Sequence, residues 1–213
     1  MTRLQRLIRL SAVALTAVAL SGCISLFPKS EPANLYRFDY LMPAEAASPP
    51  RASSEKFGVL KLSNEFNKAA GGDRIMTVTG GSDVAYIAEA RWVSPASVLF
   101  DEAVSRAFDQ DGKSARLISR GEIGQSDYVL KLDVRDFQVN YAAPKGRPSV
   151  VVNVHAVLTR SADRSVAAER TFSQTVAADG DRQADIVRAF TVGVSGVLRD
   201  LVEWTSSLGK AAS

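Results

Sequence analysis

The chain has one cysteine, Cys23, and one histidine, His155, and the chemistry of these two side chains needs explaining first. A histidine can act as general base toward a hydroxyl such as that of Ser173 when an acid orients its ring. His155, however, shares the polar side of the alternating stretch 150–158 with Asn153, and no serine lies in a Gly-x-Ser-x-Gly turn. We therefore predict no catalytic, cofactor-binding or metal-binding residue. A hydrolase that uses His155 is the alternative.

Cys23 directly follows a short apolar segment. Residues 1–9 contain Arg3, Arg6 and Arg9 and no acid, and residues 10–20 form an uncharged run rich in Leu, Val and Ala. A basic segment followed by an apolar one is typical of a secretory signal. A membrane-spanning helix needs roughly 20 apolar residues, about twice the length of this run. The pattern predicts export without a permanent membrane span.

The end of this signal, Leu20-Ser21-Gly22-Cys23, resembles the bacterial lipobox, a Leu and two small residues before a Cys. The resemblance implies that diacylglycerol is attached to the Cys23 thiol, that residues 1–22 are removed and that the new amino group is acylated. Each buried methylene contributes about 0.8 kcal/mol and one acyl chain holds only marginally, so three chains make a stable anchor. An ordinary signal followed by an incidental cysteine is the alternative.

Two further features bear on location and partners. Ile24 follows the cysteine where an Asp would retain enteric lipoproteins in the inner membrane, which by resemblance indicates the periplasmic face of the outer membrane. Three of the 26 basic residues lie in residues 1–22, so the mature chain has 23 basic and 23 acidic residues. With no excess of basic residues, nucleic acid is not a predicted partner.

The mature chain divides into a tether, residues 23–34, and a single domain, residues 35–213. Removal of residues 1–22 leaves 191 of the 213 residues, enough for one sizeable core. Residues 42–56 combine Pro, Ala and Ser without an apolar period and are expected to form a flexible loop.

Periodicity predicts an α+β domain in which one mid-chain helix and one C-terminal helix pack on an antiparallel-rich sheet. Ser94 as N-cap and Pro95 as first helical residue should begin the mid-chain helix, and Gly112 should end it. The C-terminal helix covers about 182–208. Strands are expected at 34–41, 57–62, 74–78, 84–90, 114–119 and 127–142, followed by an antiparallel pair at 148–160 and 166–176.

Two local irregularities have structural interpretations. Within 127–142 the apolar side chains change parity across Arg135-Asp136, which a β-bulge would explain; a charge pair at an active site is the alternative. Gly80-Gly81 between two apolar runs indicates a hairpin rather than a phosphate-binding loop.

The C-terminal helix carries the small residues Gly193, Ser195 and Gly196, which permit close approach of another backbone. The domain's own sheet is the favoured neighbour, and another subunit is the alternative.

A family resemblance is carried mainly by "VAYIAEARWVSPASVLFDEAVSRAF", residues 84–108. This stretch resembles the central motif of the ABC-type transport auxiliary lipoproteins, in which a strand, an Arg-Trp pair and a Pro precede a helix. The lipidated start and the C-terminal helix ending near Trp204 are similar to that family as well. The resemblance implies membrane attachment through lipid on Cys23, and as partners a periplasmic MCE-domain protein with its ABC permease and ATPase. A second copy of the chain is a further partner to consider.

Within that motif, Tyr86, Arg91 and Trp92 are candidate interface residues, because Trp and Arg are frequent binding hot spots. The alternative is structural, with Trp92 in the core and Arg91 paired with an acid. The predicted function is that of a non-enzymatic outer-membrane lipoprotein assisting ABC/MCE-type lipid transport. The alternative function is assistance to outer-membrane protein assembly, or activation of a cell-wall synthase.

Overall fold

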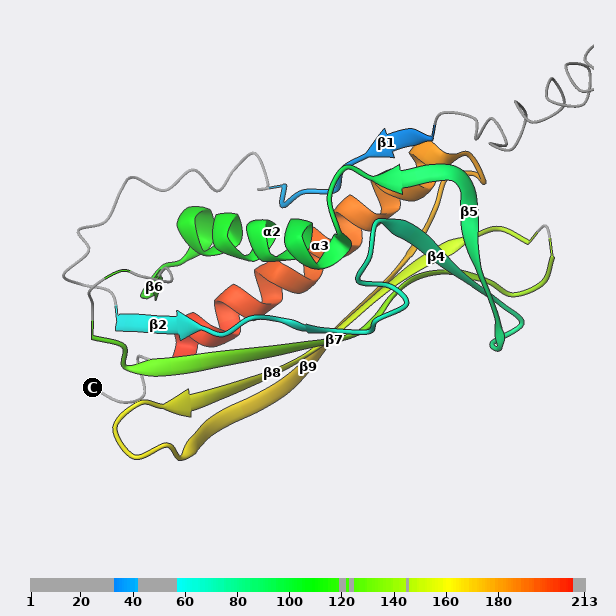
Figure 1. Ribbon diagram of the computed structural model, residues 1–213. Coiled ribbons are helices and arrows are strands. Elements are labelled where there is room, and N and C mark those ends of the chain that lie inside the picture. The colour runs from blue at the N-terminus through cyan, green and yellow to red at the C-terminus, as the bar shows by residue number, and fades with distance from the viewer. Residues whose placement is uncertain (1–32, 42–56, 119–121, 123–124, 145, 209–213) are drawn as a thin grey trace, which may run out of the picture. The chain divides into compact units, whose positions relative to one another are not determined.

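The computed structural model describes residues 33–41, 57–118, 122, 125–144 and 146–208. The predicted signal, Cys23, most of the tether and the loop 42–56 lie outside the described residues. Two helices, α2 (Ala96–Asp111) and α3 (Gln183–Leu208), lie on the same side of a mixed sheet, which confirms the α+β class (Figure 1).

The sheet is organised around its longest strand, β7 (Tyr128–Tyr141). One edge of β7 pairs antiparallel with β8 (Ser149–Arg160), and β8 pairs antiparallel with β9 (Val166–Ala177). The other edge pairs in parallel with three short strands in turn, β2 (Phe57–Lys61), β3 (Glu65–Phe66) and β4 (Arg74–Thr79). The remaining strands are β6 (Ala115–Ile118) beside β2, β5 (Asp83–Trp92) beside β4, and β1 (Asn34–Tyr36) beside β5.

The prediction of an antiparallel-rich sheet was therefore wrong in part. Among the described strands, five of the eight pairings are parallel, although the two longest ladders are antiparallel. Parallel neighbours need a crossover connection, and α2 carries the chain from β5, which lies beside β4, across to β6, which lies beside β2. Side-chain periodicity reports which face of a strand is buried but not the direction of its neighbour.

The predicted bulge and hairpin are present. The register between β7 and β8 shifts between Val134 and Asp136, and this shift returns Phe137 to the same buried side as Val134. At the β4–β5 turn, Gly80 and Gly81 have φ of 61° and 85°, which glycine adopts without steric cost.

The start of α2 differs from the prediction. Its N-cap is Pro95, and no side chain caps the helix, so Ser94 does not have the expected role. The first amides are satisfied from a distant loop instead: the N–H of Ala96 donates to Gly72 O at 2.9 Å and that of Ser97 to Gly71 O at 3.2 Å. Backbone carbonyls from the loop before β4 thus replace the capping hydroxyl.

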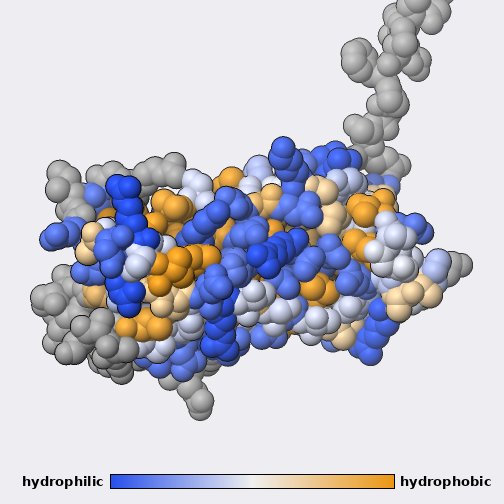
Figure 2. All heavy atoms as spheres, turned by 90° about the horizontal axis from the view of Figure 1, so that it is seen from below, coloured by the Kyte–Doolittle hydropathy of each residue, from blue (hydrophilic) through white to orange (hydrophobic). Residues whose placement is uncertain are grey.

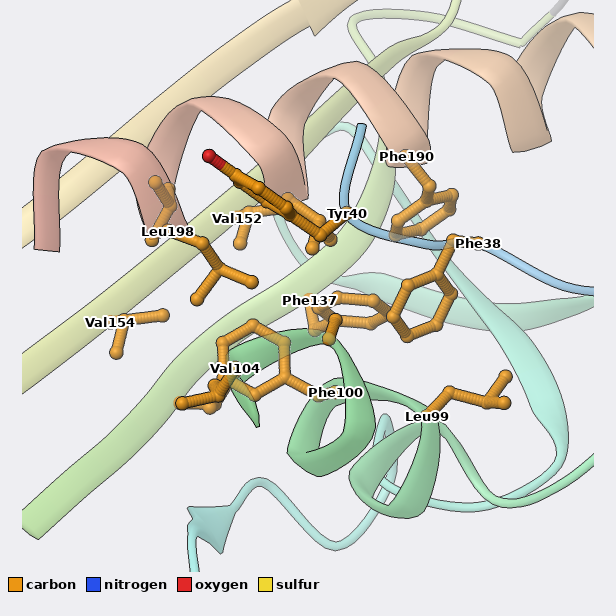
Figure 3. Close-up of a cluster of buried hydrophobic side chains, with 14 of the residues drawn as sticks. Phe38, Tyr40, Leu99, Phe100, Val104, Phe137, Val152, Val154, Phe190 and Leu198 are labelled. Carbon is orange, nitrogen blue, oxygen red and sulfur yellow. The ribbon is translucent and has the colours of Figure 1, made fainter. Parts of the chain in front are cut away.

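Aromatic rings fill the space between the sheet and the helices (Figure 3). The ring centroid of Phe137 lies 4.8 Å from that of Phe190 on α3, 5.1 Å from that of Phe38 and 6.3 Å from that of Phe100 on α2. All four side chains are at most 1% exposed. Phe137 is therefore the point at which the sheet, both helices and the N-terminal segment meet.

The small residues of α3 lie against the domain's own sheet, as favoured from the sequence. A Cβ on Gly193 would lie 3.4 Å from Val152 Cγ2, and one on Gly196 would lie 3.1 Å from Gln174. Ser195 has another role, since its Oγ accepts the N–H of Leu41 at 2.9 Å.

We call residues 37–41, which follow β1, the strap. The expected strand 34–41 pairs only at Asn34–Tyr36, but the alternation continues and buries Phe38 and Tyr40. The Arg37 guanidinium donates to Glu102 of α2 at 2.6 Å. The strap thus contacts both helices and completes the layer that covers the sheet.

Seen from below, hydrophilic residues divide the hydrophobic ones into small groups (Figure 2). Along β8, alternate residues from Val150 to Leu158 are fully buried, whereas Val151, Asn153, His155 and Val157 are only half-buried. This agrees with the prediction of one core face and one wet face for the β8–β9 pair.

Candidate interaction surface

Tyr86 lies on β5, opposite Met76 of β4. Its hydroxyl donates to the Ala69 carbonyl at 3.2 Å. The guanidinium carbon of Arg74 lies 3.7 Å from the centre of the Tyr86 ring, within the range of a cation–π contact. These two contacts hold the ring in place while leaving the tyrosine half-buried.

Arg91 lies farther along β5 and faces Arg74 in the β4–β5 ladder. Its Nη1 lies 2.8 Å from Asp73 Oδ2, and the two side chains are 47% and 50% exposed. Such an exposed ion pair contributes about 1 kcal/mol or less to stability. Arg91 is therefore paired with an acid and at the same time accessible to a partner.

Trp92 is not on this surface. It is 2% exposed, and its ring meets those of Phe38 and Phe190 edge-on at 5.0 and 5.2 Å. Its burial fits the structural alternative for this residue, and an interface role would require the core to open. Arg74 takes its place beside Tyr86 and Arg91, and the three residues form what we call the β4–β5 surface. The apolar periodicity of residues 74–78 does not identify Arg74 as a surface residue of interest. Only the strand pairing, which places Arg74 opposite Arg91, does so.

A hollow of about 560 Å³ lies along the outer side of α2. This volume is within the range of small-molecule sites. Its polar groups are largely engaged: Lys61, only 9% exposed, pairs with Asp101, and the Ser97 hydroxyl donates to Gly71 O at 3.1 Å. Its walls also include exposed apolar residues, Leu62 at 43% and Val98 at 45%. The hollow can hold an apolar group, but its arrangement does not suggest a reaction.

His155 lies on the wet face of the sheet, and its Nδ1 is 3.1 Å from the Thr171 hydroxyl. In the β7–β8 ladder it faces Asp133, whose carboxylate pairs with Arg135 at 3.0 Å. Among the described residues, no group of three or more His, Cys, Asp or Glu side chains could hold a metal ion. Nor is any helix in the described part of the chain long and apolar enough to cross a membrane.

Two carboxyl groups at the helices have shifted pKa values. Burial raises the pKa of Asp111, at the end of α2, where the carboxylate accepts the Tyr40 hydroxyl; Arg199 and Lys113 partly oppose this shift. The hydrogen bond from Arg182 lowers the pKa of Asp185 in the first turn of α3. Both groups hold a helix end in place, and neither faces the β4–β5 surface.

Comparison with known families gives a match to the ABC-type transport auxiliary lipoprotein component over residues 40–202. The chain belongs to this family. The match covers nearly the whole described domain, including α2, most of α3 and the β4–β5 surface, and confirms the resemblance noted in the sequence. A comparison with curated proteins found no match.

Solved structures show the same fold. A crystal structure of a protein from Xanthomonas campestris is 25% identical with a TM-score of 0.69, covering 84% of this chain and 98% of its own. A second crystal structure, of an uncharacterized protein, is 12% identical with a TM-score of 0.65, covering 83% and 100%. A hypothetical protein from Chlamydia trachomatis is 9% identical with a TM-score of 0.52, covering 73% and 99%. The fold thus tolerates wide sequence divergence.

Proposed function

We propose that this chain is a non-enzymatic lipoprotein, attached through lipid on Cys23 to the periplasmic face of the outer membrane, that assists an MCE-type ABC system moving lipid between the two membranes. The observation that carries the proposal is the family match over residues 40–202, because the family's description as an ABC-type transport auxiliary component supports such a role. The lipobox-like sequence before Cys23 supports the anchor. ATP hydrolysis belongs to the partner ATPase.

The β4–β5 surface is the proposed docking site for the periplasmic MCE-domain protein. It presents one aromatic ring and two guanidinium groups on paired strands, and these residue types dominate binding hot spots. Arg74 and Arg91 can each make several directed hydrogen bonds to carboxylates or backbone carbonyls. Trp92, the residue after Arg91, packs in the core and anchors that end of β5.

The test is photocrosslinking in intact cells from a photoreactive residue placed at position 91. Position 199 on the exposed side of α3 is the matched control, since it too carries an arginine in the native chain. Capture of an MCE-domain protein from position 91 but not from position 199 supports the proposal. Capture of only a cell-wall synthase or an outer-membrane barrel protein would instead favour the assembly or activator role.

A further inference from the structure

Strand β9 lies at an edge of the sheet. It runs from Val166 to Ala177, and among the described residues it pairs with β8 alone. Its backbone groups on the far side therefore have no strand beside them in the described domain. An unpaired edge of this length is a template for another strand.

The outward-facing groups can be identified from one hydrogen bond. The N–H of Ala178 donates to Pro148 O at 3.0 Å. Backbone groups of an antiparallel strand point alternately to its two sides, so the even-numbered residues 168–176 face β8. The odd-numbered residues, from Glu169 through Thr171 to Ala177, direct their N–H and C=O groups outward.

This edge has little of the usual protection of edge strands. The sequence "VAAERTFSQTVA" has no Pro and no Lys, and the register shift against β8 lies at its beginning, beside Leu158 and Thr159. From Ala168 to Ala177 the ladder is regular, and Thr, Phe and Val favour extended structure. Its charged residues, Glu169 and Arg170, are adjacent.

These two charges restrict how the strand could pair with itself. In an antiparallel pair centred on Arg170 or on Glu169, identical charges would stand directly opposite each other, which is destabilising. In a pair centred on Thr171, Arg170 faces Phe172 of the second copy. Glu169 then faces Ser173 of the second copy. Arg170 already lies over an aromatic ring in its own chain, 5.2 Å from the centre of Phe172. This register also joins outward-facing residues, as the hydrogen bonding requires.

We propose that β9 pairs antiparallel with β9 of a second copy about a two-fold axis at Thr171, which joins two sheets into one. The second copy is the occupant because the edge is complementary to itself in this register, the condition for a closed two-fold interface. The interface is separate from the β4–β5 surface and does not depend on the proposed transport role.

Disulfide trapping in cells tests the pairing. In the proposed dimer the two Thr171 Cα atoms lie about 5.5 Å apart, inside the range that a disulfide bridges. The expected result for Thr171→Cys in the full-length lipoprotein is a dominant band at twice the monomer mass on a non-reducing gel. Thr175→Cys is the matched control, because Thr175 is also exposed but would lie about 27 Å from its counterpart.

A second pair of variants tests the backbone directly. Thr171→Pro removes one outward amide hydrogen and leaves the bonds to β8, whereas Thr171→Val keeps that hydrogen. By light scattering of the purified lipoprotein in detergent, Thr171→Val should remain dimeric and Thr171→Pro should be monomeric. A Thr171→Cys chain that stays monomeric while its thiol reacts with maleimide overturns the proposal. Equal crosslinking at 171 and 175, or a disulfide to a different protein, does so as well.

Discussion

Replacing Phe38 by Ala should destabilise the domain severely, although Phe38 precedes the region that matches the family model. The side chain is 1% exposed and meets the rings of Trp92 and Phe137 at 5.0 and 5.1 Å. Deleting a buried Phe costs about 3–5 kcal/mol through lost transfer energy and the cavity left behind. Because two aromatic contacts disappear as well, we expect about 4 kcal/mol, a large part of the 5–15 kcal/mol typical of a domain.

The assay is urea unfolding of the mature chain followed by tryptophan fluorescence, since Trp92 lies directly against the altered site. With a urea dependence of about 2 kcal/mol per molar, a loss of about 4 kcal/mol lowers the midpoint by about 2 M. Leu41→Ala is the control, because Leu41 is also in the strap but 60% exposed. The urea midpoint of this variant should differ from that of the wild type by about 0.3 M or less. If both variants unfold at the wild-type midpoint, the strap is not part of the core.

Three other predictions follow from the described contacts and from the lipobox. Gly196→Leu should cost about 1–3 kcal/mol in urea unfolding, because even a Cβ would lie 3.1 Å from a β9 side chain, whereas Gly72→Ala meets nothing within 4 Å and should be nearly neutral. Asp185→Asn should lower the free energy of unfolding at pH 7, and the difference from the wild type should shrink as the pH falls below about 4. The reason is that the pKa of Asp185 is lower in the folded than in the unfolded chain, so the ionised carboxylate stabilises the fold above the unfolded-state pKa and this benefit is lost on acidification through the folded-state pKa. A deficit independent of pH would contradict this. Cys23→Ser should leave unprocessed precursor at the inner membrane on immunoblots of fractionated cells and abolish function while the domain still folds, and normal maturation of the variant would refute the lipoprotein assignment.

The features that were predicted correctly depend on neighbours in the sequence. The bulge at Arg135-Asp136 changes the parity of apolar residues within one strand, and Gly80-Gly81 supplies positive φ within one turn. Both helices likewise follow from their own apolar spacing. Each of these signals is complete within a few residues, so the sequence alone is sufficient to find it.

The features that were missed depend on segments far apart in the chain. The carbonyls of Gly71 and Gly72, more than twenty residues before α2, take over the capping that Ser94 was expected to provide. The parallel pairing of β2, β3 and β4 along β7 depends on the path of the connections. The burial of Trp92 likewise needs rings from the strap, β7 and α3 at once. Composition and the spacing of apolar residues do not reveal these long-range contacts.

The strap also limits how far the domain can lie from its proposed lipid anchor. Residues 37–41 are fastened to both helices, so the number of residues between Cys23 and Asn34 limits the distance from the domain to the proposed lipid. About ten residues extend to roughly 35 Å at most. If Cys23 carries the proposed lipid, the domain stays within about that distance of the membrane surface, and a partner anchored in the opposite membrane would itself have to span the remaining distance.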